Sequence, residues 1–462
     1  MTSNNKIHFE VSERKILLRV VDVVFVLGML HMVGSIFDFR YFTISPVNYY
    51  WTLVLSLYLL FFGTVFEMYN LQVASNQYQV IKSTVLTTSL TVLVYLLTPK
   101  ITPALPENRL QIFLFYIGIF CSLLFWRITY VKFIASNRFW KRAIFICHQN
   151  ELPELIRGIQ KTDPHFKVVG FINLSNTNTA KFKDVDTINL NDLEDYLAEH
   201  YVSEIVIASQ KTESITVELY NVLIKLLESG VSIREYTQVY ESITHRIPVQ
   251  YVAQDFYKYF PFSRSNQNKL YLIFVRTVEV AMALTGLIIG LFIAPIIMLG
   301  NLLGNKGPLL YTQERVGKNG QTFKIYKLRS MVVDAEKNGA VFATTNDARV
   351  TAFGRILRKS RLDEVPQFIN VLKGDMAIIG PRPERPVFVK EIAAMMPFYE
   401  TRHVVKPGLT GWAQVNYSYG ETLQDSLIKL QYDLYYIKHR SLFLDLNIVV
   451  KTISTVLFYR GQ

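Results

Sequence analysis

The sequence predicts a multi-domain membrane protein. We expect an α-helical transmembrane bundle, a doubly wound α/β domain, and a mostly α C-terminal domain with a re-entrant membrane helix and interfacial amphipathic helices. Three observations predict this fold class. Half of the 462 residues are hydrophobic and only 19% are charged, four apolar stretches precede residue 136, and short β-rich runs alternate with helical runs after residue 142. This balance is more apolar than that of ordinary soluble domains.

The net charge and the cysteine content limit the kinds of site that the protein can contain, but they do not identify its ligand. The formal net charge is +12, which suits anionic lipid, a phosphorylated substrate or nucleic acid equally, because all three attract cations. The two cysteines, Cys121 and Cys147, exclude a disulfide framework and a cysteine-based metal site. We expect no cleaved signal peptide, since no small-residue cleavage pattern follows the first apolar run.

After an N-terminal tail at 1–13, the region 14–137 is predicted to hold four transmembrane helices. Its apolar stretches each approach the ~20 residues that cross a hydrocarbon core: 15–37, 49–70, 79–98 and 110–135. Basic residues crowd the start of the first stretch and the end of the fourth: Lys6, Arg14, Lys15, Arg19, Arg127, Lys132, Arg138, Lys141 and Arg142. The positive-inside rule therefore places both ends in the cytoplasm. Long buried helices of a soluble core are the alternative.

The region 138–262 is predicted to be a Rossmann-like α/β domain. Strand-like runs alternate with helix-like runs, as doubly wound domains require: strands at 142–147, 167–173, 204–209 and 231–236, and helices at 151–161, 191–200 and 214–229. A dinucleotide site needs glycines in the first turn, but that turn reads Cys147-His148-Gln149-Asn150-Glu151. A structural or regulatory role is therefore favoured over nucleotide binding.

A fifth apolar run, Val280 to Leu303, lies within the predicted membrane segment 263–305. It contains two glycines and the pair Ala294-Pro295, and proline kinks or breaks a helix. Both flanks are basic. A helix that enters the bilayer, breaks at Ala294-Pro295 and returns keeps both flanks in the cytoplasm, whereas a full crossing leaves one outside. We therefore expect re-entry.

The C-terminal domain, 306–462, is dense in groups that recognise phosphate. Guanidinium groups can bind two phosphate oxygens at once, and glycines allow close backbone approach. Between 311 and 416 the cations include Arg315, Lys318, Lys324, Lys327, Arg329, Arg349, Arg355, Arg358, Lys359, Arg361, Lys373, Arg382 and Arg385. A polyanionic ligand is predicted, and a solvated basic face is the alternative. The amphipathic runs 427–438 and 442–458 suit interfacial helices and core-facing helices equally.

Two adjacent acids, Asp363 and Glu364, lie within this basic segment. Pro366 suits the first turn of a helix, so both carboxylates are expected near a helix N-terminus, where the dipole and the arginines keep a carboxylate ionised. Such a carboxylate can attack phosphorus, and its neighbour can hold Mg²⁺. Because Ser360 precedes Asp363 by three residues, a capping box is an equal alternative when the surroundings are ignored.

Two later segments combine glycine with rigid or aromatic residues. The segment 380–386 reads GPRPERP, and its prolines are expected to form a rigid turn that points Arg382 outward, as in a nucleotide or phosphate clamp. A purely structural turn is the alternative. In the segment 406–415, Trp412 could line a pocket or pack in a core.

These residues resemble the monotopic polyprenyl-phosphate sugar-1-phosphate transferases of bacterial glycan assembly, in their long form. The resemblance covers nearly the whole chain in architecture and is specific from about 269 to 462. The motifs that carry it are YTQERVGKNGQTFKIYKLRSM at 311–331, LRKSRLDEVPQFINVLKGDMAIIGPRPERP at 357–386 and VVKPGLTGWAQVN at 404–416.

The resemblance implies a re-entrant helix that leads into a catalytic domain. It implies that Asp363 is the nucleophile and Glu364 its acidic partner near Mg²⁺. The candidate substrate-binding residues are Arg358, Arg382, Lys327, Arg329, Pro381 and Pro383. The sequence departs from the family pattern at Ala294, where serine is frequent, at Glu279, where aspartate is frequent near Arg276, and in the turn without glycine.

The expected reaction transfers a sugar-1-phosphate from a UDP-sugar to polyprenyl (undecaprenyl) phosphate through a phosphosugar-aspartate. It would begin an exopolysaccharide, capsule or O-antigen unit. The expected location is the bacterial inner membrane, multi-pass, with the catalytic domain on the cytoplasmic face. The expected partners are the lipid bilayer and both substrates, without nucleic acid, and a homo-oligomer stays open. The alternatives are a non-catalytic scaffold or regulator that binds nucleotide-sugar or lipid, and a membrane carrier or channel for a phosphorylated solute.

Overall fold

The computed structural model describes residues 11–37, 39–70, 74, 77–98, 100–134, 140–163, 165–174, 182, 184–208, 216–249, 268–305, 307–335, 337, 347–396, 398–417 and 422–457. The chain divides into two compact units, Met1–Thr244 and His245–Gln462. The predicted boundaries at 137/138 and 262/263, and the flanking cations Lys6 and Arg138, lie outside the described residues.

The N-terminal region of the first unit is helical. Its long helices are α1 (Val11–Ile36), α2 (Tyr49–Val65), α4 (Gln77–Leu96) and α5 (Arg109–Thr129). Within this region α1, α4 and α5 are long and apolar enough to cross a membrane, whereas α2 has only 17 residues. The predicted stretch 49–70 was too long because the chain turns after Val65, and Glu67 adopts a left-handed backbone with φ 59°. The length and composition of these helices identify a membrane protein.

A buried ion pair joins α1 and α5. Arg127 donates to Asp22 at 2.5 Å and to the Met68 carbonyl at 2.8 Å, and both charged side chains are shielded from solvent. A charge inside a membrane bundle is tolerated when it is paired. The contacts give Asp22, one of the few ionisable residues in the predicted spans, a packing role.

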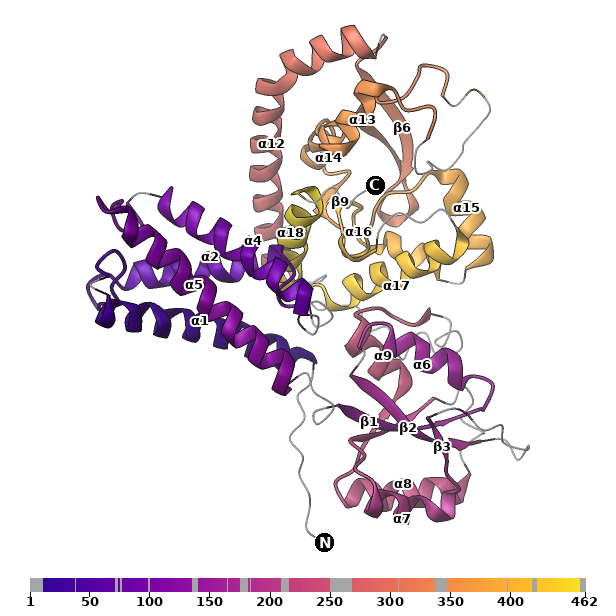
Figure 1. Cartoon of the computed structure of the whole chain (residues 1–462). Coiled ribbons are helices and arrows are strands. Elements are labelled where there is room, and N and C mark those ends of the chain that lie inside the picture. The colour runs from indigo at the N-terminus through magenta and orange to yellow at the C-terminus, as the bar shows by residue number, and fades with distance from the viewer. Residues whose placement is uncertain are drawn as a thin grey trace. The chain divides into compact units, whose positions relative to one another are not determined.

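The α/β domain follows the predicted pattern closely. Its strands are β1 (Lys141–Cys147), β2 (Phe166–Asn173), β3 (Asp186–Thr187), β4 (Glu204–Ile207) and β5 (Ser232–Glu235). All neighbours pair in parallel, in the order β3-β2-β1-β4-β5. The helices are α6 (Leu152–Gln160), α7 (Leu193–Glu199), α8 (Val217–Glu228) and α9 (Tyr236–Thr244). Figure 1 shows α6 and α9 on one face of the sheet and α7 and α8 on the other. The doubly wound prediction is confirmed.

The second unit begins with a long apolar helix, α12 (Lys269–Gly304), which contains Pro295 and is also long enough to cross a membrane. Proline does not break the helix in two, contrary to the expected helix-break-helix. Instead the ribbon bends near its C-terminal end (Figure 1), as a missing N–H and a ring clash one turn back allow. Membrane re-entry stays a prediction.

Short elements build the rest of the second unit. They are β6 (Leu310–Val316), β7 (Thr322–Leu328), α13 (Ala352–Lys359), α14 (Gln367–Lys373), β8 (Ala377–Ile379), α15 (Pro386–Met395), β9 (Gly408–Thr410), α16 (Trp412–Asn416), α17 (Leu423–His439) and α18 (Leu442–Leu457). The strands β6 and β7 form an antiparallel hairpin, and β8 pairs with β9 in parallel. This domain is mostly helical, as predicted.

The core of the second unit resolves two questions that the sequence left open. Helix α17 is core-facing, since Leu430 and Leu434 are fully buried, whereas α18 buries Ile448 but exposes Phe443. Trp412 packs in the same core, and its indole N–H donates to the His245 carbonyl at 3.1 Å.

The second unit also starts earlier than predicted. Ile247 and Val249 are buried in its core, and the Ile247 N–H donates to the Gln431 carbonyl at 3.1 Å. These residues fell within the predicted α/β domain, which was drawn to 262.

Candidate functional site

The two adjacent acids lie on a short turn between α13 and α14. We call this turn, Leu362–Glu364, the acid turn. Helix α13 ends at Lys359, and Arg361 adopts a left-handed backbone with φ 58° before a 3₁₀ turn at Leu362–Glu364. Glycine is the usual residue in this conformation after a helix, because a Cβ adds strain. A strained arginine at this position fixes the direction in which the chain enters the acid turn.

The capping-box alternative is not supported. The Ser360 hydroxyl donates back to carbonyls of α13, and neither the 3₁₀ turn nor α14 receives a side-chain cap. The N-cap position of α14 is Pro366. Asp363 therefore does not serve as a helix cap, although the predicted helix after Pro366 is present.

Asp363 is buried and poorly satisfied. Its exposed fraction is 8%, and its Oδ1 oxygen has no hydrogen-bond partner among the described residues. Burial raises the pKa of Asp363 to about 6, and the neighbouring Glu364 carboxylate adds to the rise, while Lys327 and Arg358 act against it. A buried oxygen without a hydrogen-bond partner lowers the stability of the folded protein. Such an oxygen is typical of a site that binds a further group.

Glu364 is the acid that the cations hold. Its Oε1 oxygen lies 3.1 Å from Arg382 Nη2, 3.5 Å from Lys327 Nζ and 3.7 Å from Arg361 Nη1. Burial alone would raise the pKa of Glu364, but these cations outweigh it and lower the pKa to about 2.

The difference between the two acids corrects an expectation from the sequence. We expected the arginines to keep the nucleophile candidate, Asp363, fully ionised. Instead the three contacts go to Glu364, and the pKa of Asp363 rises. Adjacent carboxylates repel each other when both are ionised. Glu364, which the cations contact, therefore stays ionised, and Asp363 keeps its proton more readily.

The predicted substrate-binding arginines have different positions. Arg358 lies on the last turn of α13, where its Nε donates to the Ser330 hydroxyl at 2.9 Å. Arg329 is buried, and its guanidinium donates to the carbonyls of Pro308, Met331 and Asn305. These contacts tie Arg329 to the chain that follows α12, so we assign it to packing and not to the substrate.

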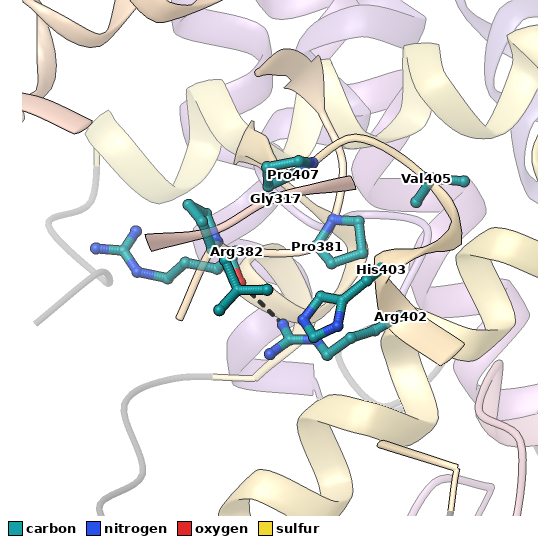
Figure 2. A pocket seen from close by; sticks show the side chains of 9 residues that line it. Gly317, Pro381, Arg382, Arg402, His403, Val405 and Pro407 are labelled. Atoms are coloured by element: carbon teal, nitrogen blue, oxygen red, sulfur yellow. Dashed lines mark hydrogen bonds between the residues drawn. The ribbon is translucent and has the colours of Figure 1, made fainter. Parts of the chain in front are cut away.

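The segment 380–384 forms the rigid turn that was expected. Pro381 and Pro383 are buried, and between them the Arg382 side chain keeps 33% exposure and reaches Glu364. Figure 2 shows the pocket beneath this turn, where the Arg382 side chain extends away from the His403 ring. Burial lowers the pKa of His403 to about 4, with the positive charge of Arg402 contributing, so this imidazole is neutral at pH 7.

Helix α12 supports the acid turn through two glycines. A Cβ at Gly286 would lie 2.3 Å from the Phe368 ring, and one at Gly290 would lie 2.7 Å from Val365 Cγ1. Arg276 of the same helix donates to the Val371 carbonyl at 2.7 Å and to Leu372 at 3.0 Å, at the C-terminal end of α14. The apolar helix and the acid-bearing segment therefore form one packed body.

Comparison with known proteins identifies the second unit. Residues 270–459 match the family described as bacterial sugar transferase. A Bacillus subtilis (strain 168) protein, provisionally named an undecaprenyl-phosphate N-acetylgalactosaminyl 1-phosphate transferase, is 49% identical over 141 residues, which are 30% of this chain and 79% of that protein. The chain belongs to the bacterial sugar transferase family.

Other members of the family are similar over different lengths. The UDP-N-acetylgalactosamine-undecaprenyl-phosphate N-acetylgalactosaminephosphotransferase of Aeromonas hydrophila is 37% identical over 254 residues, which cover 54% of this chain and 58% of that protein. The UDP-glucose:undecaprenyl-phosphate glucose-1-phosphate transferase of Escherichia coli (strain K12) is 42% identical over 168 residues, 35% of this chain and 36% of that protein. The chain thus aligns with little more than half of the Aeromonas protein and about a third of the Escherichia coli protein.

One residue of the site escaped the sequence prediction. Arg361 appeared only as one of many cations, yet it contacts Glu364 and its backbone directs the acid turn. Nothing in the sequence pattern separates it from Lys359 or Arg355, because a left-handed arginine has no signature of its own.

Proposed function

We propose that this member of the bacterial sugar transferase family transfers a sugar-1-phosphate from a UDP-sugar to polyprenyl (undecaprenyl) phosphate. The observation that carries the proposal is the acid turn. Asp363 presents a buried oxygen without a partner in the described structure, beside a glutamate held by Arg382, Lys327 and Arg361. A nucleophile among phosphate-binding cations suits attack on a diphosphate.

The first step forms a covalent intermediate. An oxygen of the Asp363 carboxylate attacks the β-phosphorus of the UDP-sugar, and the bond from that phosphorus to the bridging oxygen breaks. UMP leaves with the electron pair, while the sugar stays bound through its phosphate to Asp363. Burial of the carboxylate limits competing attack by water.

The second step returns the enzyme to its starting state. A phosphate oxygen of the polyprenyl phosphate attacks the same phosphorus, and the bond to Asp363 breaks. The products are polyprenyl-diphosphate-sugar and a free Asp363 carboxylate. Each step exchanges one P–O bond for another at the same phosphorus, so the reaction needs no oxidant or reductant.

Two of the cations that contact Glu364, together with Arg358, would also bind the donor. Arg382 and Lys327 lie beside the acid turn, and Arg358 is close enough to act on the charge of Asp363. We assign these three residues to the diphosphate, while Pro381 and Pro383 fix the turn that carries Arg382. Cations placed before the reaction begins stabilise the charge that develops during phosphoryl transfer.

The acid pair fits a Mg²⁺ ion that binds together with the donor. All three cation contacts of Glu364 fall on Oε1, and Asp363 Oδ1 is without a partner in the described parts of the chain. Mg²⁺ often takes one or two carboxylates and completes its shell with waters and substrate phosphates. We propose that Glu364 holds it, with Asp363 beside it. When bound, Mg²⁺ offsets the negative charge of the diphosphate.

The described residues contain no group of three or more acids, histidines or cysteines arranged as a metal site. The phosphates of the donor would therefore supply further ligands. Metal affinity should be weak without the donor and stronger with it.

The membrane arrangement is part of the proposal. We infer that α12 enters the bilayer from the cytoplasm and returns, with its bend within the apolar layer near Ala294 and Pro295. The catalytic unit then lies on the cytoplasmic face of the inner membrane, where UDP-sugars are available. Such an enzyme begins an exopolysaccharide, capsule or O-antigen unit. The relatives are named for different sugars, so the sugar is left to experiment.

The test uses the full chain in nanodiscs with undecaprenyl phosphate and a panel of β-³²P-labelled UDP-sugars. UDP-N-acetylgalactosamine, UDP-glucose and UDP-galactose are the first donors. We expect one donor to give equal amounts of UMP and solvent-extractable labelled lipid. Donor binding without either product favours a scaffold, and vesicle uptake of a phosphorylated sugar without lipid product favours a carrier. Either result contradicts the proposal.

A further inference from the structure

The turn that carries Arg382 is held at four consecutive carbonyls. The Pro381 carbonyl accepts from the Gly408 N–H and the Glu384 carbonyl accepts from the Val316 N–H, both at 2.9 Å. The two carbonyls between them accept from arginine side chains. The Arg382 carbonyl accepts from Arg402 Nη2 at 2.9 Å, and the Pro383 carbonyl from Arg315 Nη1 at 3.2 Å.

Close backbone packing explains part of this arrangement. A Cβ at Gly380 would lie 2.4 Å from the Lys406 carbonyl, and one at Gly408 would lie 2.1 Å from the Gly380 nitrogen. The turn is therefore pressed against the segment 406–408. Prolines in the turn carry no N–H, so its carbonyls are the only backbone groups through which Pro381 and Pro383 can be held.

Arg402 is the more deeply buried of the two arginines. Its exposed fraction is 5%, and Nη2 also donates to Asp433 Oδ2 at 2.7 Å, while Nη1 donates to the Tyr399 hydroxyl at 2.7 Å. Asp433 lies on α17 and is almost fully buried. A buried ion pair often adds little net stability, because desolvating both charges is costly. A role in fixing geometry is a better explanation for this pair.

A continuous path connects Asp433 to the acid turn. It runs from the Asp433 carboxylate through the Arg402 guanidinium to the Arg382 carbonyl. Figure 2 shows the hydrogen bond between Arg402 and the Arg382 carbonyl. From there the Arg382 side chain reaches Glu364 at 3.1 Å. The Arg382 side chain is a third exposed, so its own surroundings do not fix it completely. Its backbone position sets the directions that the guanidinium can reach.

We propose that Arg402, held by Asp433, is a positioning residue for the donor diphosphate and acts through Arg382. This inference rests on the function proposed above. Arg402 fixes the backbone of the turn, so that the Arg382 guanidinium is in place before the donor arrives. Arg402 itself does not touch the reacting atoms.

A double-mutant cycle tests the inference. The full chain in nanodiscs is compared with Arg402→Lys, Arg382→Ala and the double variant. The values of kcat and KM are measured separately for the UDP-sugar and for undecaprenyl phosphate. Displacement of a binding group by about 1 Å can cost about 100-fold, and lysine cannot serve Tyr399, Asp433 and the Arg382 carbonyl in the same fork. We expect Arg402→Lys to lower kcat/KM for the donor by about 10- to 100-fold.

The cycle separates positioning from a purely structural role. If Arg402 acts through Arg382, the same lysine substitution costs less than about twofold once Arg382 is alanine, because coupled residues are not additive. An equal loss in both backgrounds overturns the inference, as does a loss seen only in the KM for undecaprenyl phosphate. If the wild-type chain turns over no donor, the proposed function itself is wrong. That outcome can be distinguished from failure of the inference about Arg402, in which the wild-type chain is active.

Two further variants keep the test decisive. If Arg402→Lys does not fold, Tyr399→Phe removes one acceptor of Arg402 while it keeps the ring, and it should also lose donor efficiency only when Arg382 is present. An additive effect, or no effect, overturns the inference. Arg440→Lys is the matched control, since the Arg440 guanidinium stacks on the Tyr271 and Tyr436 rings. It should leave the donor KM unchanged.

Discussion

The turn after β1 and the turn after α13 both carry an acid, but they differ in the charges that surround it. In the α/β domain, Glu151 follows the glycine-free turn at the end of β1, and burial raises its pKa. In the second unit, Asp363 and Glu364 follow α13, and Arg382, Lys327 and Arg361 converge on Glu364. The end of a parallel strand is a frequent place for ligand sites. Here the proposed chemistry falls on the irregular turn, because the arrangement of charges, and not the fold around it, is what suits a phosphorylated substrate.

We expect the two turns to differ most in how enzyme activity responds when one carboxylate of each turn is replaced by an amide. Asp363→Asn should fold normally yet reduce UMP release by at least about 10³-fold, because an amide cannot replace the nucleophile. Glu151→Gln, the matched change in the other turn, should keep activity within about twofold. UMP release from both variants is measured at saturating donor. Normal turnover of the asparagine variant would contradict the assignment of Asp363.

Removal of a cation should have the next largest effect. Lys327→Met takes away a contact of Glu364 at 3.5 Å and should lower donor kcat/KM by about 10- to 100-fold, as expected when charge stabilisation of the transition state is lost. Lys373→Met is the control, because Lys373 is exposed and contacts the Tyr326 hydroxyl at 2.8 Å. Equal losses in the two variants would mean that the basic surface acts as a whole and that the acid turn has no special arrangement.

The pH dependence distinguishes the two acids of the site. The pKa of Asp363 is raised to about 6, and its ionised form is the proposed nucleophile. Donor kcat/KM, which reports the free enzyme, should therefore be constant above that pH and fall about tenfold per pH unit below it. The wild-type profile is measured between pH 4.5 and pH 8 in buffers of constant ionic strength. If kcat/KM began to fall only near the ordinary aspartate pKa, the burial of Asp363 would not control its charge.

The smallest expected effect concerns how α12 supports the acid turn. Gly286→Ala would place a Cβ 2.3 Å from the Phe368 ring, and such overpacking should lower the free energy of unfolding by about 1–3 kcal/mol. Gly28→Ala in α1 is matched, because a Cβ there meets nothing within 4 Å. Thermal unfolding in nanodiscs compares the two. Equal unfolding midpoints would show that α12 and the acid turn are not packed closely.

Periodicity predicted the regular parts of the chain. The strands and helices of the α/β domain follow the predicted alternation, since buried parallel strands read as apolar runs such as Ala143 to Cys147. The failures come where local pattern competes with tertiary contacts. Ile247 and Val249 pack with the second unit, and Pro295 lies inside α12 without ending it.

The acid turn could be located from the sequence, but its internal electrostatics could not. Adjacent acids among arginines predicted a site around Asp363, yet sequence cannot say which acid the arginines contact. That depends on the left-handed Arg361 and on how the Arg382 turn is held by Arg402. Likewise Arg329 and Arg358 look equivalent in sequence, and only the hydrogen bonds in the structure show that Arg329 donates to backbone carbonyls.

Intact-mass analysis of the enzyme with donor and no acceptor tests the central claim most directly. The account predicts a mass increase equal to one phosphosugar, carried on the peptide that contains Asp363 and discharged when undecaprenyl phosphate is added. Turnover of donor to lipid product with no such adduct under any quench, or an adduct on another residue, would contradict it.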